Sequence, residues 1–281
     1  MSLCAAAAYH TIPTDFTLDN LQAHFLGGPK TTIPMILKVT RLSNGRRFVV
    51  RFVSLEQDGI MLLTATVTFV NASPWTGPAM THAVNRQTNY KVDSITMDDL
   101  GEARGRLGSF MKFERMPLVF QGRCPWNARW KLLTACFLPD PSKAVTSGIA
   151  TAVAQISPAI DGVADNAKTH ILGVINLSDY HVMDTPLQLN NISMGLPTIG
   201  DVHGPRKESQ VKVGTTLNHS IHFHVHDGFR ADDLTYIEVE TSWGKDGRAM
   251  LSSRIFSKQG LLIATCIQEV GETTSLFMAA N

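Results

Sequence analysis

The stretch that decides the fold is Asp58–Val70, which reads DGIMLLTATVTFV. Apolar side chains occupy one face of this stretch and threonines the other, as in a strand that buries a single face. The apolar face consists of Leu63, Ala65, Val67 and Phe69. Asp58-Gly59 favours the positive φ angles of a two-residue hairpin turn. The stretch therefore predicts a strand that follows directly on a tight turn.

The same arrangement occurs twice in the chain. Each half contains three predicted strands that are separated by glycine-containing turns. In the first half the strands are Pro34–Thr40, Arg47–Val53 and Ile60–Val70, with turns at Asn44-Gly45 and Asp58-Gly59. In the second half they are Thr235–Thr241, Ala249–Ser257 and Leu261–Val270, with turns at Asp246-Gly247 and Gln259-Gly260. A meander of this kind must bury one face, and a helix is the usual partner.

Two segments of the sequence are candidates for that helix. Asp165–Met183 places apolar residues at helical spacing, and Ser2–His10 is a short alanine-rich run. Between the halves, Ala144–Ala164 is rich in Ala, Ser and Gly, a composition that fits a mobile linker or an inserted helix. These elements together predict the α+β class.

Composition excludes several classes of protein. The 281 residues are 44% apolar and carry a formal net charge of +1, so the chain lacks the basic footprint of a nucleic-acid-binding protein. No apolar stretch is long enough for a membrane span, and no signal peptide precedes the first strand. The last three residues, Ala279–Asn281, are not a peroxisomal address. We therefore expect a cytoplasmic protein.

Three polar residues lie within otherwise apolar segments. Asp179 falls near the end of the second predicted helix, where a helix dipole disfavours a carboxylate, although a cap or turn residue also occurs there. Gln268 shares a strand face with Ala264 and Cys266 and is either a buried amide or a solvated strand end. Thr216 precedes or begins a strand. A carboxylate, a hydroxyl and an amide are the groups needed to hold and activate one water molecule.

Four histidines lie close together, at His219, His222, His224 and His226. Strand alternation would put the last three on one face, which is possible metal-ligand geometry. No adjacent cysteine or acidic cluster completes such a site, and the four cysteines of the chain show no CxxC spacing. We expect no metal and no cofactor.

Several blocks of the sequence resemble the type II acyl-CoA thioesterases, which have a double hot-dog fold. The resemblance is clearest over Thr216–Arg230, which starts TLNHSIHFH and continues into the Gly-Phe-Arg-Ala-Asp-Asp motif at 228–233. It extends to Gln268-Glu269 and, in the first half, to Leu21–Leu26 and Asn44–Arg51. Asn218 stands where the family usually has Asp. Residues 72–160 match only loosely.

The resemblance implies two hot-dog units, at residues 1–140 and 141–281, whose sheets lie side by side and each wrap around a central helix. The first unit would lack its N-terminal strand and show an open edge, which favours a homo-oligomer. By resemblance the catalytic residues are Asp179, Thr216 and Gln268. Contacts with the substrate would fall on His219, Asn218 and Arg51.

The implied reaction is hydrolysis of an acyl thioester, on acyl-CoA or a carrier-bound acyl chain, by a water molecule that Asp179 deprotonates. A second hypothesis is a hot-dog enzyme of secondary metabolite biosynthesis that performs dehydration, isomerisation or pericyclic cyclisation on a polyketide-like or terpenoid-like substrate. A third is a non-catalytic scaffold, which the three retained polar residues argue against.

Overall fold

The computed structural model describes residues 1–72, 131–136, 149–157, 159–162, 165–179, 184–189 and 211–274. The first half contains α1 (Ser2–Tyr9), β1 (Phe16–Phe25), β2 (Ile36–Asn44), β3 (Phe48–Gln57) and β4 (Ile60–Asn71). The second half contains β5 (Lys131–Cys136), β6 (Ile149–Ser157), α3 (Ala167–Ser178), α4 (Asp184–Leu189), β7 (Val211–Phe223), β8 (Thr235–Lys245), β9 (Arg248–Ser257) and β10 (Leu262–Thr274).

The described strands form one 10-stranded sheet in the order β2-β3-β4-β1-β7-β10-β9-β8-β6-β5. The two halves have the same internal order, because β2-β3-β4-β1 mirrors β8-β9-β10-β7. They join edge to edge where β1 pairs antiparallel with β7, and the pair Gln22–Ser220 lies at the centre of that ladder. A helix precedes the four strands in each half. The internal repeat that the sequence predicts is therefore present.

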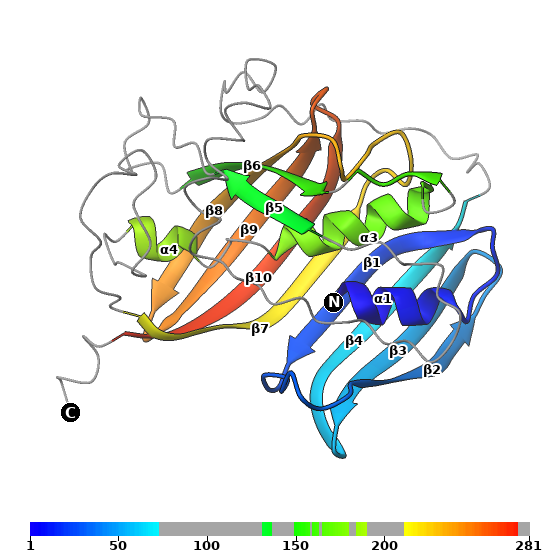
Figure 1. Cartoon of the computed structure of the whole chain (residues 1–281), viewed down its shortest axis with the longest axis horizontal. Coiled ribbons are helices and arrows are strands. Elements are labelled where there is room, and N and C mark those ends of the chain that lie inside the picture. Colours follow the sequence, from blue (N-terminus) through cyan, green and yellow to red (C-terminus); the bar gives the residue numbers. More distant parts are fainter. Residues whose placement is uncertain are drawn as a thin grey trace.

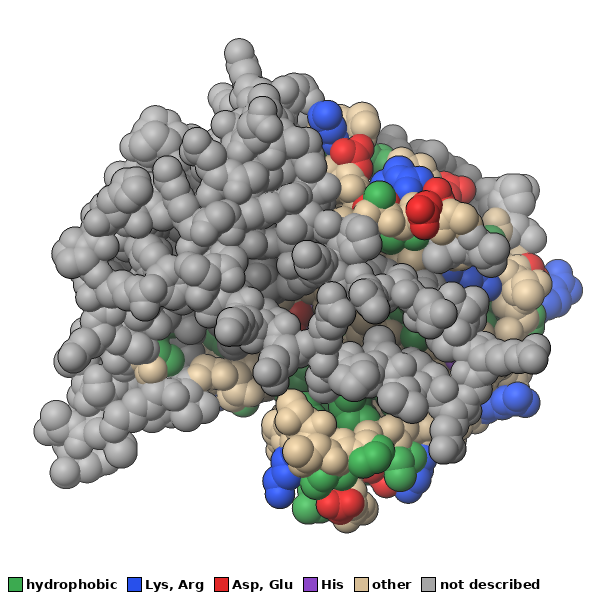
Figure 2. Space-filling view, viewed as in Figure 1, with side chains coloured by type: hydrophobic (Ala, Val, Ile, Leu, Met, Phe, Trp, Pro, Cys, Tyr) green, Lys and Arg blue, Asp and Glu red, His purple; other side chains and the backbone are tan. Residues whose placement is uncertain are grey.

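Both long helices lie on the same face of the sheet (Figure 1). The helices bury apolar residues against it, including Cys4, Ala5 and Ala8 of α1 and Ile171, Val174 and Ile175 of α3. The alternation in β4 is as predicted, because Leu63, Ala65, Val67 and Phe69 are all buried. On the face seen in Figure 2, acidic and basic side chains of the described residues are interspersed.

Two of the tight turns have the predicted backbone. Both central residues have positive φ in Asp58-Gly59 (49° and 78°) and in Asp246-Gly247 (54° and 69°). Aspartate and glycine tolerate this region better than other residues, which is why these dipeptides mark the hairpins. Asn44-Gly45 differs, since neither residue has a positive φ.

The second helix is shorter than predicted. It starts after Asn166, whose side chain accepts a hydrogen bond from the backbone N–H of Thr169, and it ends at Ser178 with Asp179 as its C-cap. Residues 180–183 lie outside the described part of the chain. Asp179 therefore follows the helix and is not part of its last turn.

The middle of the chain holds the largest difference from prediction. Residues 149–157, expected to form a linker or a helix, form β6, because they pair with β8 along Ile149–Ala154. β5 lies within residues 1–140 but pairs with β6, so it extends the second half of the sheet. The unit boundary at residue 140 stays a prediction. β2 is the outermost strand at the other end and is largely exposed.

None of the helices in the described residues combines the length and the apolar character needed to cross a bilayer.

Candidate active site

Asp179, Thr216 and Gln268 converge on one point. The Gln268 Nε2 atom donates to Asp179 Oδ1 at 2.7 Å and to Thr216 Oγ1 at 2.8 Å. The Thr216 hydroxyl donates to the same Asp179 Oδ1 at 3.2 Å. The three polar groups thus form a closed triangle, although they are far apart in the sequence.

The sheet register explains how two of these residues meet. Gln268 in β10 pairs with His219 in β7, and Val270 pairs with Thr216. The register shifts between these pairs, so that Leu217 is an extra residue in β7. This bulge places Thr216 beside Gln268 on the inner face of the sheet. The carboxylate of Asp179, the C-cap of α3, lies on the same face.

The cluster is closed on one side and open on the other. Thr216 and Gln268 are 7% and 1% exposed, whereas the Asp179 side chain is 37% exposed. The Gln268 amide uses its nitrogen within the triangle, but its oxygen, Oε1, is buried without a hydrogen-bond partner among the described residues. A buried acceptor of this kind is unfavourable unless a water molecule or a ligand reaches it.

His219 packs directly behind the carboxylate. It is fully buried, with Nδ1 at 3.5 Å from Asp179 Oδ1 and Nε2 at 3.2 Å from Ser178 Oγ. The Ser178 hydroxyl donates to the Ile175 carbonyl at 2.8 Å and lies within hydrogen-bond distance of Nε2. This burial favours a positioning role for His219 over the predicted contact with substrate.

The surroundings set the charge of Asp179. Burial alone would raise the pKa of this carboxyl, but the interaction with His219 and the hydrogen bond from Thr216 outweigh it and hold the pKa below its ordinary value. The group is therefore a carboxylate at neutral pH and is able to accept a proton.

The neighbouring thiol is not a nucleophile. Cys266 lies two residues before Gln268 on the same strand face and is buried. Burial raises its pKa to about 12, with a further contribution from Asp179, against hydrogen bonds with Ser253 and Ser178 that lower it. The thiolate form that nucleophilic catalysis needs is therefore absent at neutral pH.

Two other residues that were expected to bind substrate have different surroundings. Asn218 donates to Glu269 at 2.9 Å and, as the neighbour of His219 in β7, faces the opposite side of the sheet from the cluster. Arg51 is 1% exposed, and its guanidinium makes five hydrogen bonds, to Thr11, Ser43, Asn44 and Val50. All five donors of Arg51 therefore have partners within the protein, which favours a structural role over the predicted contact with substrate.

The Phe-Arg-Ala-Asp-Asp motif anchors the start of α3. Arg230 pairs with Asp165 and Asp232 at 2.9 Å each, and its guanidinium also donates to the Ile160 carbonyl at 2.8 Å. The pKa of Arg230 is raised by these hydrogen bonds to the two carboxylates. His170 of α3 completes the cluster, since it accepts from the Ala231 N–H and contacts Asp165. The motif thus fixes the helix whose other end carries Asp179.

The histidine row does not form a metal centre in the part of the chain that the structure describes. His222 and His224 are exposed, and His224 Nε2 lies 2.8 Å from Thr265 Oγ1. No three His, Cys, Asp or Glu side chains of the described residues come together as metal ligands.

Comparison with known proteins places the chain in a family. Family models for the acyl-CoA thioesterase N-terminal domain and C-terminal domain match residues 1–70 and 111–271. The chain belongs to the acyl-CoA thioesterase family, a class of thioester hydrolases.

Individual relatives agree with that assignment. Acyl-coenzyme A thioesterase 8 of Mus musculus is 23% identical, and the match covers 96% of this chain and 77% of that protein. The protein of the same name from Homo sapiens is also 23% identical, with 94% and 75% covered.

Solved structures confirm the predicted double hot-dog fold. The acyl-CoA thioesterase II TesB2 of Mycobacterium marinum superposes with a TM-score of 0.63 at 18% identity and covers 97% of this chain and 87% of its own. A hot-dog protein of Alicyclobacillus acidocaldarius superposes with a TM-score of 0.60 at 14% identity, with 97% and 86% covered. At these identities the likeness concerns the fold alone.

Proposed function

We propose that this protein hydrolyses acyl-CoA thioesters by direct attack of a water molecule that Asp179, Thr216 and Gln268 hold. The observation that carries the proposal is the triangle of hydrogen bonds on Asp179 Oδ1, together with the buried Gln268 Oε1, which has no hydrogen-bond partner among the described residues. The names of the curated relatives, which are acyl-coenzyme A thioesterases, support the choice of substrate.

In the proposed mechanism, each oxygen of the site has a separate task. Asp179 Oδ1 is occupied by donors from Thr216 and Gln268, which fix the plane of the carboxylate. The other oxygen, Oδ2, takes the proton from water as general base. Gln268 Oε1 accepts the second hydrogen of that water and orients its lone pair towards the thioester carbonyl carbon.

The remaining steps follow from thioester chemistry. Water oxygen bonds to the carbonyl carbon while its proton passes to Asp179, and the carbonyl oxygen becomes an oxyanion. When the tetrahedral intermediate collapses, the carbon–sulfur bond breaks and the CoA thiolate leaves, to be protonated by Asp179 or solvent. The products are a carboxylic acid and CoA thiol, and Asp179 is regenerated as a carboxylate.

The alternatives named from the sequence stay hypotheses. Dehydration and isomerisation would also need a base, a role that Asp179 can fill, and a pericyclic cyclisation needs no proton transfer, so the choice of hydrolysis rests on the acyl-coenzyme A thioesterase relatives. The homo-oligomer and the cytoplasmic location also stay predictions.

Thiol release decides between hydrolysis and the alternatives. Purified protein is incubated with acyl-CoAs of short, medium and long chain in the presence of a chromogenic thiol reagent. We expect enzyme-dependent release of CoA for at least one chain length, well above the rate with heat-inactivated protein. Absence of release at every chain length would reject the proposed reaction.

His219 is expected to act through Asp179. In His219→Gln the carboxylate loses a partner that orients it and holds its charge, so we expect kcat to fall by about 10- to 100-fold while KM changes little. If His219 instead contacted the substrate, KM would rise and kcat would stay unchanged.

The control for His219→Gln is His222→Gln, on the exposed face of the same strand. Its kcat and KM should both match the wild type. Equal kinetics of the His219 and His222 variants would refute the positioning role.

A further inference from the structure

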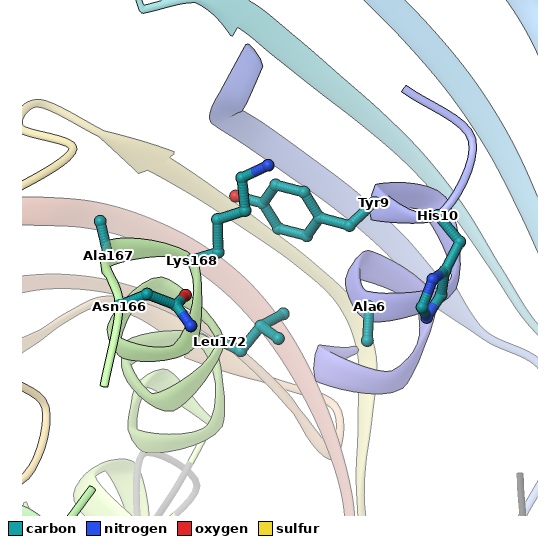
Figure 3. Close-up of a pocket in the computed structure, with 7 residues that line it drawn as sticks. All are labelled: Ala6, Tyr9, His10, Asn166, Ala167, Lys168 and Leu172. Atoms are coloured by element: carbon teal, nitrogen blue, oxygen red, sulfur yellow. The ribbon is translucent and has the colours of Figure 1, made fainter. Parts of the chain in front are cut away.

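A cavity lies between the two long helices, away from Asp179. It has a volume of about 450 Å³ and is lined by Ala6, Tyr9, His10, Asn166, Ala167, Lys168 and Leu172 (Figure 3). Its size falls within the usual range for small-molecule sites, about 300–1,000 Å³. Because the lining residues include the first turn of α3, the cavity and Asp179 lie at opposite ends of that helix. Twelve residues at 1.5 Å each separate Ala167 from Asp179, about 18 Å.

The internal repeat relates this cavity to the candidate active site. His10 is the C-cap of α1, as Asp179 is the C-cap of α3. The last turn of α1 packs beside the first turn of α3, since Lys168 Nζ lies 5.2 Å from the centre of the Tyr9 ring. The cavity therefore sits at the end of α1 that corresponds to the Asp179 end of α3.

The chemistry of hydrolysis is absent from this counterpart. Both inner strands have a register shift at the same place, next to Leu18 in β1 and next to Thr216 in β7, so Leu18 corresponds to Thr216. Beyond the shift, Leu21 of β1 pairs with Val67, and the equivalent residue of β7, His219, pairs with Gln268. Val67 therefore corresponds to Gln268. Leu18 and Val67 are fully buried.

Tyr9 fills the space that the catalytic groups occupy in the second half. Its ring packs edge-on against Phe69 with centroids 4.9 Å apart, and its hydroxyl accepts a hydrogen bond from the Leu18 N–H at 3.0 Å. Among the described residues, His10 stands at the position of Asp179, but Leu18 and Val67 replace the hydroxyl and amide that would hold a water.

The lining of the cavity matches one kind of ligand. Ala6, Leu172 and the Tyr9 ring are apolar, while Lys168 lies in the first turn of α3, at the positive end of the helix dipole, with its ammonium 3.3 Å from the Thr14 carbonyl and 5.2 Å from the centre of the Tyr9 ring. Burial lowers the pKa of Lys168, against an opposing effect of Asp15, so an additional anion beside the ammonium would offset the cost of its desolvation.

We propose that this cavity is a non-hydrolytic binding site for a carboxylic acid with an apolar tail, held by Lys168 at its carboxylate. The class of ligand rests on the proposed function, because such an acid is the product of thioester hydrolysis. Binding at the cavity needs no turnover, so its test is independent of whether the Asp179 site hydrolyses anything.

The test is equilibrium binding of a fatty acid with a fluorescent conjugated tail, alongside the alcohol with the same tail. In Lys168→Gln we expect the affinity for the acid to fall about tenfold, because a charge-assisted hydrogen bond is lost, and the affinity for the alcohol to stay unchanged. Lys245→Gln, which changes an exposed lysine of β8, is the matched control and should bind both probes as the wild type does.

Two further variants test whether the fluorescent acid binds in this cavity or at Asp179. Ala6→Phe fills the cavity and should remove this binding, while Asp179→Asn, at the other end of α3, should leave it in place. Circular dichroism tests whether Ala6→Phe is folded. If Ala6→Phe is unfolded, the affinity of Lys168→Gln for the acid tests the proposal by itself. Equal affinity for the acid in Lys168→Gln and Lys245→Gln, or loss of all binding in Asp179→Asn alone, would overturn the proposal.

Discussion

Asp179→Asn is expected to lower kcat for thioester hydrolysis by about 10²–10⁴-fold, the usual contribution of a general base. The amide has nearly the same shape as the carboxylate, so Thr216 and Gln268 keep a neighbour of the right size. It cannot accept a proton, however, and water is a poor nucleophile without a base. Steady-state CoA release with the best acyl-CoA substrate measures the effect.

The matched control for this change is Asp246→Asn. Asp246 lies in the turn between β8 and β9, outside the Asp179 cluster, and its positive φ of 54° suits asparagine as well as aspartate. Its kcat should equal that of the wild type. If Asp179→Asn retained the full rate of hydrolysis, Asp179 would not be the base.

Arg51→Met is expected to lower the free energy of unfolding by about 3 kcal/mol, because it removes a charged group that satisfies several buried acceptors at once. The five hydrogen bonds of Arg51 tie the segment after α1, at Thr11, to the β2–β3 hairpin at Ser43 and Asn44. Methionine has a similar length but no donors. Denaturant unfolding followed by circular dichroism measures the loss.

Arg41→Met controls for the loss of one positive charge. Arg41 pairs with Arg51 across β2 and β3 but is exposed, so its removal should change stability by less than about 0.5 kcal/mol. The KM of folded Arg51→Met should equal that of the wild type. A raised KM without a loss of stability would restore the substrate contact that the sequence suggested.

Local signals in the sequence were sufficient where secondary structure depends on near neighbours. The alternation in Ile60–Val70 and the Asp58-Gly59 and Asp246-Gly247 dipeptides predicted the hairpins, and the structure confirms them. β6 was missed because alanines alternate with its strand formers Ile149, Thr151 and Val153, and the Ala-, Ser- and Gly-rich composition of Ala144–Ala164 as a whole indicated a linker or helix. It is a strand because β8 offers it a partner, which is a tertiary effect that no local pattern encodes.

The candidate site likewise combines features that the sequence predicts with features that only the tertiary structure shows. The resemblance selected Asp179, Thr216 and Gln268, and the structure brings them together, but it also shows relations that the sequence does not contain. Whether His219 faces the cluster depends on the bulge at Leu217, which shifts the register of β7 by one residue. Arg51 has no such signal either, since a charged residue in a strand indicates a binding role as readily as a buried structural one.

A single turnover in water enriched in heavy oxygen, with enzyme in excess over acyl-CoA, tests the central claim most directly. If a water held by Asp179, Thr216 and Gln268 attacks the thioester itself, one heavy oxygen enters the product acid and none enters Asp179, as mass spectrometry of both would report. Heavy oxygen in the Asp179 carboxylate, or a product acid that contains none, would mean that the carboxylate attacks first, and would contradict the account.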